Sequence, residues 1–538
     1  MTRRTLLFPL FLFVLIAAAS GVGTSSGDGA TSEPAVHLPW QEAGWSEREA
    51  AAHLLDRFAY GARPGDVDRV VAMGLDAWFA RQLAADLPEP ELERRLAPLT
   101  SLRLPAAEMA SRFPGRGQVL LAAIEAGAVP EELMAGGERR EKLEQAMAEM
   151  PAAERAELRR AVRDFARREG YGRPQELYEQ LAAAKLLSAV YAENQLREVV
   201  TDFWFNHLNV SVTDPEARGF VAAYERDAIR PHVFADFRTL LGASARHPAT
   251  LLYLDNARSV AEAGARKLFE PRRAGRRGRP ERPNAPQGLN ENYARELLEL
   301  HTLGVDGGYT QEDVVAVARA FTGWALVPPG DGRQRVEERL ARAERRFGAG
   351  RLREAGFVRD GEFLFRADVH DAGAKTILGQ RFPAGGGVEE GERVLDLAAA
   401  HPSTARHLAE KVARRFVADD PPASLVERLA GVYRASGGDL RALVAAVAES
   451  PELWDHEVRG AKVKTPFELV VSALRAVDAE VADTGALVRR LDAMGQRPYA
   501  CSPPTGWEDR AEAWVGTGSL LDRMNFASEL AAGEVRGV

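Results

Sequence analysis

Residues 195–210 read QLREVVTDFWFNHLNV, and this stretch decides the fold class. One apolar face recurs at i, i+3, i+4, i+7 and i+11, which is helical spacing; its members are Leu196, Val199, Val200, Phe203 and His207. The stretch predicts an amphipathic helix that ends near Asn209. Because most of the chain carries similar spacing with strong helix formers in between, we predict a large, multi-helical, all-α fold.

The sequence predicts where several helices begin. Thr465–Glu468 combines a capping Thr, a Pro at the first helical position and a Glu three residues after the cap. Thr310–Asp313 is a weaker version of the same pattern. His247-Pro248 and His401-Pro402 each place a His before a Pro that begins a helix, so we interpret both histidines as structural.

One region predicts β-structure. Residues 362–365 (EFLF) and 375–378 (KTIL) are rich in β-branched and aromatic residues and flank a nine-residue segment. We expect a small β-hairpin near 362–380 whose loop contains His370 and Asp371. The acidic neighbour is placed to orient the imidazole, and loops often carry function, so this pair is a candidate site.

Composition excludes several classes of protein. The 538 residues contain 70 Lys+Arg and 78 Asp+Glu, a net charge of −8 that gives no reason to expect nucleic acid. With Cys501 as the single cysteine, an internal disulfide, a Cys-ligated metal and a c-type haem are excluded. The sequence has no P-loop, no GxGxxG after a strand and no GxSxG, so it carries no nucleotide motif. Metal content and other cofactors stay open.

The N-terminus has the pattern of an export signal. Arg3 and Arg4 precede the apolar run 5–16, and small residues follow, which predicts a signal peptide over 1–20. Residues 21–36, rich in Gly, Ser and Thr, predict a flexible linker. We therefore expect an exported chain, periplasmic or extracellular, with no integral membrane span once the signal is removed.

The rest of the chain, 37–538, is predicted to be one large helical domain with three charged insertions. These lie at about 85–180, 266–288 and 328–356. The second insertion is dense in Arg, Pro and Gly, and we interpret it as a basic loop.

Seven segments together resemble one family. They are HLLDRFAYG (53–61), FWFNHLNV (203–210), HPATLLYLDN (247–256), NENYARELLELHTLGV (290–305), FTGW (321–324), HD (370–371) and HPSTA (401–405). Over about 46–532 the chain resembles the bacterial family of domain of unknown function 1800. The family often has His or Glu where Phe205 stands. The resemblance implies an exported bacterial protein without an established activity, encoded beside a second exported protein that resembles sulfatases and alkaline phosphatases.

Helix geometry arranges the polar residues of segment 290–305. Asn290 is placed as the N-cap, and Gly304 ends the helix. At 100° per residue, Asn292, Glu296 and Glu299 form one polar patch beside the apolar stripe, with His301 at the edge of that stripe. The patch suits acid/base chemistry or a hard metal ion. Glu291, Arg295 and Glu299 equally suit an ordinary i, i+4 ion-pair ladder, which leaves Glu296 as the candidate functional carboxylate.

Two functions are compatible with these residues. The first is an extracytoplasmic binding or scaffold protein that works with a sulfatase-like partner, in which the polar residues are caps, buried hydrogen bonds and ion pairs. The alternative is an exported hydrolase acting on a polysaccharide or another cell-envelope substrate. Its candidate catalytic residues are His207, Glu296, His370 and Asp371, and its candidate substrate-binding residues are Asn206, Asn292, Arg295 and His301.

The hydrolase hypothesis makes a geometric demand. Its four candidate catalytic side chains should meet within one hydrogen bond, or one bridging water, of each other. His207 has a structural alternative, because a lone His on an apolar helix face is often a satisfied core residue.

Overall fold

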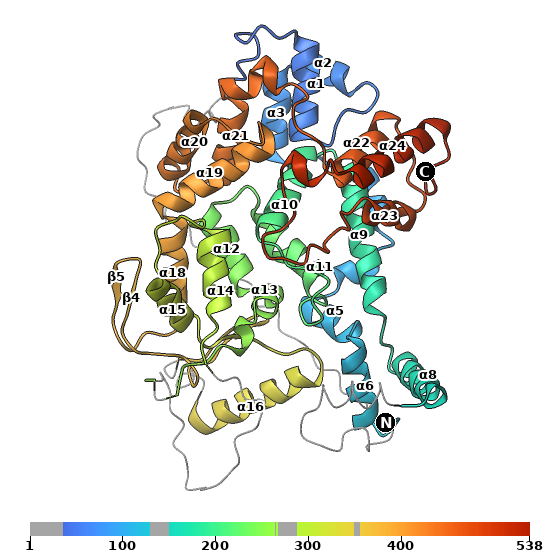
Figure 1. Cartoon of the computed structure of the whole chain (residues 1–538). Coiled ribbons are helices and arrows are strands. Elements are labelled where there is room, and N and C mark those ends of the chain that lie inside the picture. The colour runs from blue at the N-terminus through green and yellow to red at the C-terminus, as the bar shows by residue number, and fades with distance from the viewer. Residues whose placement is uncertain (1–35, 130–149, 264, 267–287, 349–355) are drawn as a thin grey trace, which may run out of the picture. The chain divides into compact units, whose positions relative to one another are not determined.

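The structure, a computed structural model, describes residues 36–129, 150–263, 265–266, 288–348 and 356–538. Helices dominate these residues, which confirms the predicted all-α class (Figure 1). The predicted signal peptide, nearly all of the linker and residues 267–287 of the basic loop lie outside the described residues. Val36–Val538 forms one compact unit.

The described residues of the first part of this unit are mostly helical (Figure 1). They are α1 (Glu47–Phe58), α2 (Asp66–Met73), α3 (Leu75–Ala84), α4 (Pro90–Leu96), η1 (Thr100–Arg103), α5 (Ala106–Arg112), α6 (Arg116–Glu125), α8 (Ala152–Arg168), α9 (Pro174–Tyr191) and α10 (Gln195–His207). The helix predicted from residues 195–210 is thus confirmed as α10, which ends two residues before the predicted Asn209.

The middle part contains two π-helical segments, η3 (Tyr224–Ile229) and η6 (Leu297–His301). Each continues an α-helix, so the helix widens without a break. The other helices here are α11 (Val221–Ala223), η4 (Arg230–His232), α12 (Phe237–Arg246), α13 (Pro248–Tyr253), η5 (Asn256–Arg258), α14 (Glu291–Glu296), α15 (Gln311–Ala320) and α16 (Asp331–Phe347). π-helical turns inside α-helices are frequent at functional sites.

The last part is again helical. Its elements are α18 (Val388–Ala399), α19 (Pro402–Phe416), α20 (Ala423–Ala435), α21 (Leu440–Ala448), η7 (Pro451–Trp454), η8 (His456–Val458), α22 (Pro466–Ala476), α23 (Thr484–Ala493), η9 (Ala511–Ala513) and α24 (Thr517–Ala532). α1 lies near α10, and α9 packs against α22 and α23, so segments far apart in the sequence share the interior.

The predicted hairpin is wrong in its pairing, although both strands exist. β3 (Phe363–Phe365) pairs antiparallel with β1 (Trp324–Leu326) and β2 (Val358–Asp360). β4 (Lys375–Ile377) instead pairs with β5 (Gln380–Phe382) across a two-residue turn. β3 and β4 therefore belong to different sheets. The sequence did not reveal β1 and β2, which are short strands.

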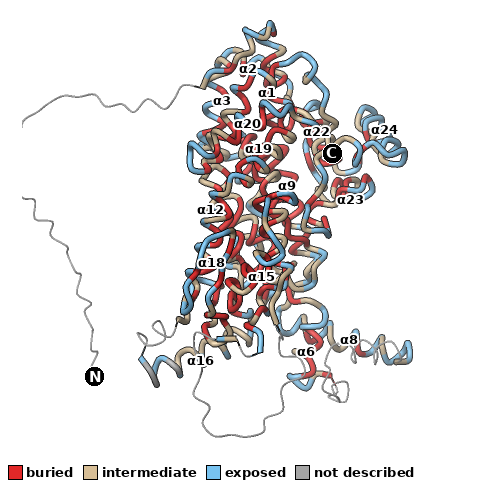
Figure 2. The backbone as a smooth tube through the Cα atoms, turned by 60° about the vertical axis from the view of Figure 1, so that its left-hand side comes forward, coloured by how far each residue is buried: buried red, intermediate tan, exposed pale blue. Residues whose placement is uncertain are grey.

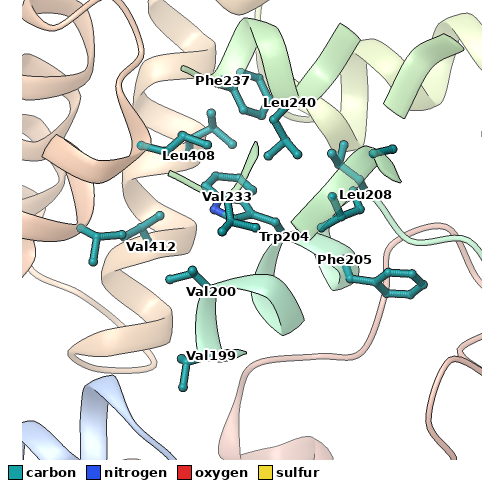
Figure 3. Packing of buried hydrophobic residues seen from close by; sticks show 14 of the residues in the cluster. Val199, Val200, Trp204, Phe205, Leu208, Val233, Phe237, Leu240, Leu408 and Val412 are labelled. Carbon is teal, nitrogen blue, oxygen red and sulfur yellow. The ribbon is translucent and has the colours of Figure 1, made fainter. Parts of the chain in front are cut away.

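α10 contributes several side chains to the hydrophobic core, and Figure 3 shows part of the packing around it. Trp204 is surrounded by apolar side chains from α10 itself, α12 and α19, and the residues around it include Val200, Phe237, Leu240, Leu408 and Val412. The sequence placed Phe203 on the buried face, but Phe203 is half-buried and Trp204 is 1% exposed. Because helices pack on several sides of α10, both sides of the predicted stripe are buried.

The predicted helix starts are confirmed. Thr465 and Glu468 form a reciprocal capping box at α22, and Thr310 forms one with Asp313 at α15. The ring Nδ1 atoms of His247 and His401 accept hydrogen bonds from backbone N–H groups at the starts of α13 and α19, at 3.1 and 3.2 Å. Both histidines are N-caps, as interpreted from the sequence.

The helices α8 and α24 have few buried residues (Figure 2). Phe526 is the single buried residue of α24, and Leu158 and Phe165 are the buried residues of α8. α8 and α6 share a separate small core around Ala123 and Ile124. Among the described residues, none of the helices combines the length and the apolar composition needed to cross a membrane.

The position of Trp204 makes a stability prediction. Replacing Trp204 with Ala removes a fully buried ring from a close-packed core, which lowers the free energy of unfolding by about 3–5 kcal/mol. The control is Leu521→Ala, because Leu521 is 60% exposed on α24 and its truncation changes stability by less than about 0.5 kcal/mol. Unfolding midpoints followed by circular dichroism check both; equal midpoints would contradict the central role of Trp204.

Candidate functional site

The polar segment 290–301 begins as predicted and ends differently. The Asn290 side chain accepts hydrogen bonds from the backbone N–H groups of Asn292 and Tyr293, so it is the N-cap of α14. Its amide also donates to the Leu254 carbonyl at 2.6 Å. From Leu297 the helix becomes π-helical, so the angles calculated at 100° per residue no longer apply to His301. His301 is buried rather than at the edge of the apolar stripe.

His301 belongs to a cluster of three histidines. The His207 Nε2–H donates to the His301 carbonyl oxygen at 3.0 Å, and the His407 Nε2–H donates to the Leu300 carbonyl at 3.3 Å. The ring centroid of His207 lies 6.3 Å from that of His301 and 6.1 Å from that of His407. A carbonyl only accepts, so the proton of His207 is on Nε2 and its Nδ1 has a free lone pair.

These histidines are neutral at pH 7. Burial, with the Lys411 charge nearby, lowers the pKa of His301 to about 3 and that of His407 to about 4, and it lowers the pKa of His207 well below its ordinary value. His207 Nδ1 and His301 Nε2 have no hydrogen-bond partner among the described residues. Nevertheless, no group of three or more His, Cys, Asp or Glu side chains in this part of the chain is arranged to hold a metal ion.

His370 and Asp371 lie in a second, largely buried network. The His370 Nδ1–H donates to the Thr322 carbonyl at 2.8 Å, and its Nε2 lies 3.3 Å from a Glu390 carboxylate oxygen. Lys375 Nζ donates to the same carboxylate and to the Gly373 carbonyl. Because the His370 side chain is 0% exposed, a substrate has no access to it in this structure.

Asp371 does not orient the imidazole as expected from the sequence. Its carboxylate accepts from Arg319 Nε at 2.8 Å and Nη2 at 3.2 Å, and from the Gly373 N–H at 2.8 Å. Burial by itself raises the pKa of Asp371, but these hydrogen bonds outweigh it, and the pKa lies below its ordinary value. The carboxylate facing His370 is Glu390, which the sequence analysis missed because Glu390 is twenty positions further along the chain and on α18.

Glu296 is the accessible candidate. It is half-buried and has no hydrogen bond or ion pair in the described part of the chain. Burial, followed by repulsion from Glu299, raises the pKa of the Glu296 carboxyl. Only half of the ion-pair ladder forms: Arg295 lies 3.7 Å from Glu291, whereas Glu299 accepts a hydrogen bond from Tyr309. Asn292 is exposed.

Asn206 holds the C-terminal part of the chain. Its Nδ2 donates to the Trp507 carbonyl at 2.8 Å, and its Oδ1 accepts from the Trp507 N–H at 2.7 Å. Gly506 has φ +74°, and a Cβ there would lie 2.2 Å from the Asn206 carbonyl oxygen, so glycine is required. Asn209 makes parallel contacts with the Cys501 and Pro503 carbonyls. The Asn206 amide, which the hydrolase hypothesis assigned to substrate binding, is therefore already hydrogen-bonded to the backbone of Trp507.

The structure thus places the eight candidates in different surroundings. His207 and His301 lie together, His370 and Asp371 lie together, and Glu296 is separate from both pairs. No hydrogen bond or ion pair between these groups is present among the described residues. The convergence that the hydrolase hypothesis demands is not found. His407, Arg319 and Lys375, which complete the two buried networks, had no signal in the sequence beyond helical or strand spacing.

These features define a large all-α protein whose polar motif residues serve as caps and as buried ties between distant segments. The family model described as protein of unknown function (DUF1800) matches residues 53–536, nearly the whole chain. The chain therefore belongs to the DUF1800 family, as the sequence motifs indicated. No curated protein and no solved structure matches it.

The Asp371 network predicts a pH-dependent loss of stability. Replacing Asp371 with Asn removes the charge that Arg319 pairs with, which costs about 2 kcal/mol at pH 7. The folded pKa of Asp371 is depressed, so its contribution is present above the ordinary pKa of 3.8 and is lost as the pH falls through the lower folded value. Wild type and Asp371→Asn should differ in denaturant midpoint at pH 7 and converge in strong acid. A constant difference would contradict this.

The histidine cluster predicts a second pH-dependent loss of stability, which begins as the pH falls below 6.5. His301 and His407 bind protons in the unfolded chain below pH 6.5 but, in the folded chain, only near 3 and 4. Stability is therefore complete above pH 6.5 and declines as the pH falls, by about 1.4 kcal/mol per pH unit for each histidine. His407→Gln should reduce the slope between pH 6 and 5 by about that amount, whereas the loss of the hydrogen bond to the Leu300 carbonyl shifts stability equally at every pH and leaves the slope unaffected. Denaturant unfolding at each pH measures the slope; an unchanged slope would show that His407 protonates in the folded chain.

Proposed function

We propose that this chain is an exported bacterial binding or scaffold protein that works with a second exported, sulfatase-like protein. The observation that carries the proposal is the internal use of the polar motif residues. His207, His370 and Asp371 are each less than 5% exposed and hydrogen-bonded within the fold. Asn206 and Asn290 bind backbone groups of other segments. Side chains of this kind stabilise an arrangement and do not meet a substrate.

Export rests on the sequence pattern of residues 1–20, which lie outside the described residues. The positive start, the apolar run and the small residues after it support this part of the proposal. The sulfatase-like partner rests on the family resemblance.

A scaffold needs a surface for its partner, and α24 offers one. Leu520, Leu521 and Met524 are 44, 60 and 67% exposed on this helix, and Val515 just before it is 40% exposed. Contiguous apolar residues on a surface favour a protein–protein contact. We infer that α24 is where the partner binds.

The alternative hydrolase now depends on Glu296 alone. Its raised pKa and free carboxyl suit a general acid. A second catalytic group beside it is not found in hydrogen-bond contact among the described residues. The binding role therefore fits the geometry better.

A co-purification experiment tests the proposed function. The chain and the exported sulfatase-like protein encoded beside its gene should form a complex on size-exclusion chromatography. The double variant Leu521→Asp and Met524→Asp should weaken the complex at least about tenfold, because it places two charges in an apolar contact. Val305→Asp is the matched control, since Val305 is 67% exposed and lies elsewhere.

Two outcomes would overturn the proposal. The first is the absence of a complex at micromolar concentrations of both proteins. The second is hydrolysis of an envelope polysaccharide by the purified chain that is lost in Glu296→Gln, which would establish the hydrolase instead.

A further inference from the structure

A large cleft lies away from all eight candidate residues. Its volume is about 2110 Å³, and its walls come from α6, α8, the start of α9, residues 212–222, β1, β3 and α16. Pockets for small molecules are usually about 300–1,000 Å³. The cleft is therefore large enough for a segment of a polymer.

The charge of this cleft is opposite to that of the chain. Nine arginines and two carboxylates are found among the described residues that line it, whereas the whole chain has a net charge of −8. Both carboxylates are already paired: Glu216 with Arg258 at 2.7 Å, and Asp368 with Arg366 at 3.4 Å. The excess positive charge is thus not neutralised from within the cleft.

Six of the lining arginines have no ion-pair partner in the described part of the chain; they are Arg116, Arg159, Arg163, Arg218, Arg339 and Arg497. Arg159 and Arg163 are four residues apart on α8, so they face the same way about 6 Å apart along the helix axis. Like charges at this spacing destabilise a helix unless an anion lies between them. An anionic occupant would remove that cost.

Arg218 gives the clearest sign of a missing partner. Its Nε atom is buried and has no hydrogen-bond acceptor among the described residues. Gly115 allows the guanidinium to lie close, because a Cβ there would be 2.9 Å from Arg218 Nη2. A buried donor without an acceptor costs free energy, so an acceptor from a ligand is expected at this position.

The cleft also offers apolar surface. Leu158, Val162 and the half-buried Tyr171 lie along one wall, and Pro328 and Pro329 line it as well. Arg497 lies over the Tyr178 ring at 4.5 Å, so that ring face is already covered and cannot stack on a base. Carboxylate and sulfate groups match the guanidinium fork, and apolar side chains match the faces of sugar rings.

We propose that this cleft binds a chain of an acidic polysaccharide, with Arg159, Arg163 and Arg218 contacting its carboxylate or sulfate groups. The site is separate from α24 and from Glu296. Polysaccharide binding in this cleft is a function additional to the proposed binding of a protein partner, and a test of one does not decide the other.

Binding of labelled polymers to the purified full chain tests the proposal. Fluorescence anisotropy should report binding of heparin and polygalacturonate and no binding of neutral dextran. The double variant Arg159→Gln and Arg163→Gln should raise the Kd for the acidic polysaccharides about tenfold or more. The matched control is Arg160→Gln with Arg168→Gln, because it removes the same charge from exposed positions of α8 outside the cleft.

Arg218→Gln is a second variant in case α8 loses its structure. It lies on a different segment, and it should raise the Kd at least about threefold while the helical circular dichroism stays unchanged. The proposal is overturned if the control variant weakens binding as much as the cleft variant, if dextran binds equally well, or if a short DNA duplex binds more tightly than both acidic polysaccharides. Failure of the wild-type chain to bind either polysaccharide would also overturn it.

Discussion

The structure depends on the burial of α10, a helix that carries polar side chains into the core. α10 packs against α1, α3, α9 and η3, and Gln195, Glu198, Thr201 and His207 are buried along with its apolar residues. A buried polar group must find a partner, because leaving it unpaired is costly. Gln195 accepts from the Tyr60 N–H and donates to the Ala189 and Ala192 carbonyls, and Arg230 pairs with Glu198 at 2.6 Å. These partners come from several different elements, so one helix fixes the positions of many segments.

The features that the sequence predicted correctly depend on residues that are close together along the chain. The N-caps at Asn290, Thr465 and Thr310 and the helix over 195–207 depend on residues within a turn or two of each other, and all were predicted correctly. The pairing of β3 with β1 depends on residues about forty positions apart, and the predicted hairpin was wrong because strand spacing carries no information about partners. The π-helical segment at Leu297–His301 was not predicted, because the spacing of 100° per residue assumes an α-helix throughout.

The sequence also predicted some features of the candidate site and missed others. The sequence identified His370 and Asp371 as a candidate pair in a loop, with Asp371 placed to orient the imidazole, and the structure places both residues in one network of hydrogen bonds. The patterns paired the two side chains with each other, however, whereas Asp371 binds Arg319 and His370 faces Glu390. Buried networks select partners by distance in space. A residue's neighbour in sequence is often directed elsewhere, because successive side chains point in different directions.

Satisfied and unsatisfied polar groups therefore carry different information about this chain. Asp371, Asn206 and Asn290 have their partners inside the fold, and their hydrogen bonds stabilise it. Six of the nine arginines that line the cleft around Arg218 lack an ion-pair partner in the described part of the chain, although the chain has more acidic than basic residues. A random placement of charge would put carboxylates among these arginines. Their absence from the cleft, beyond the paired Glu216 and Asp368, leaves positive charge that the fold itself does not use, and this is the property that a binding surface for an anion requires.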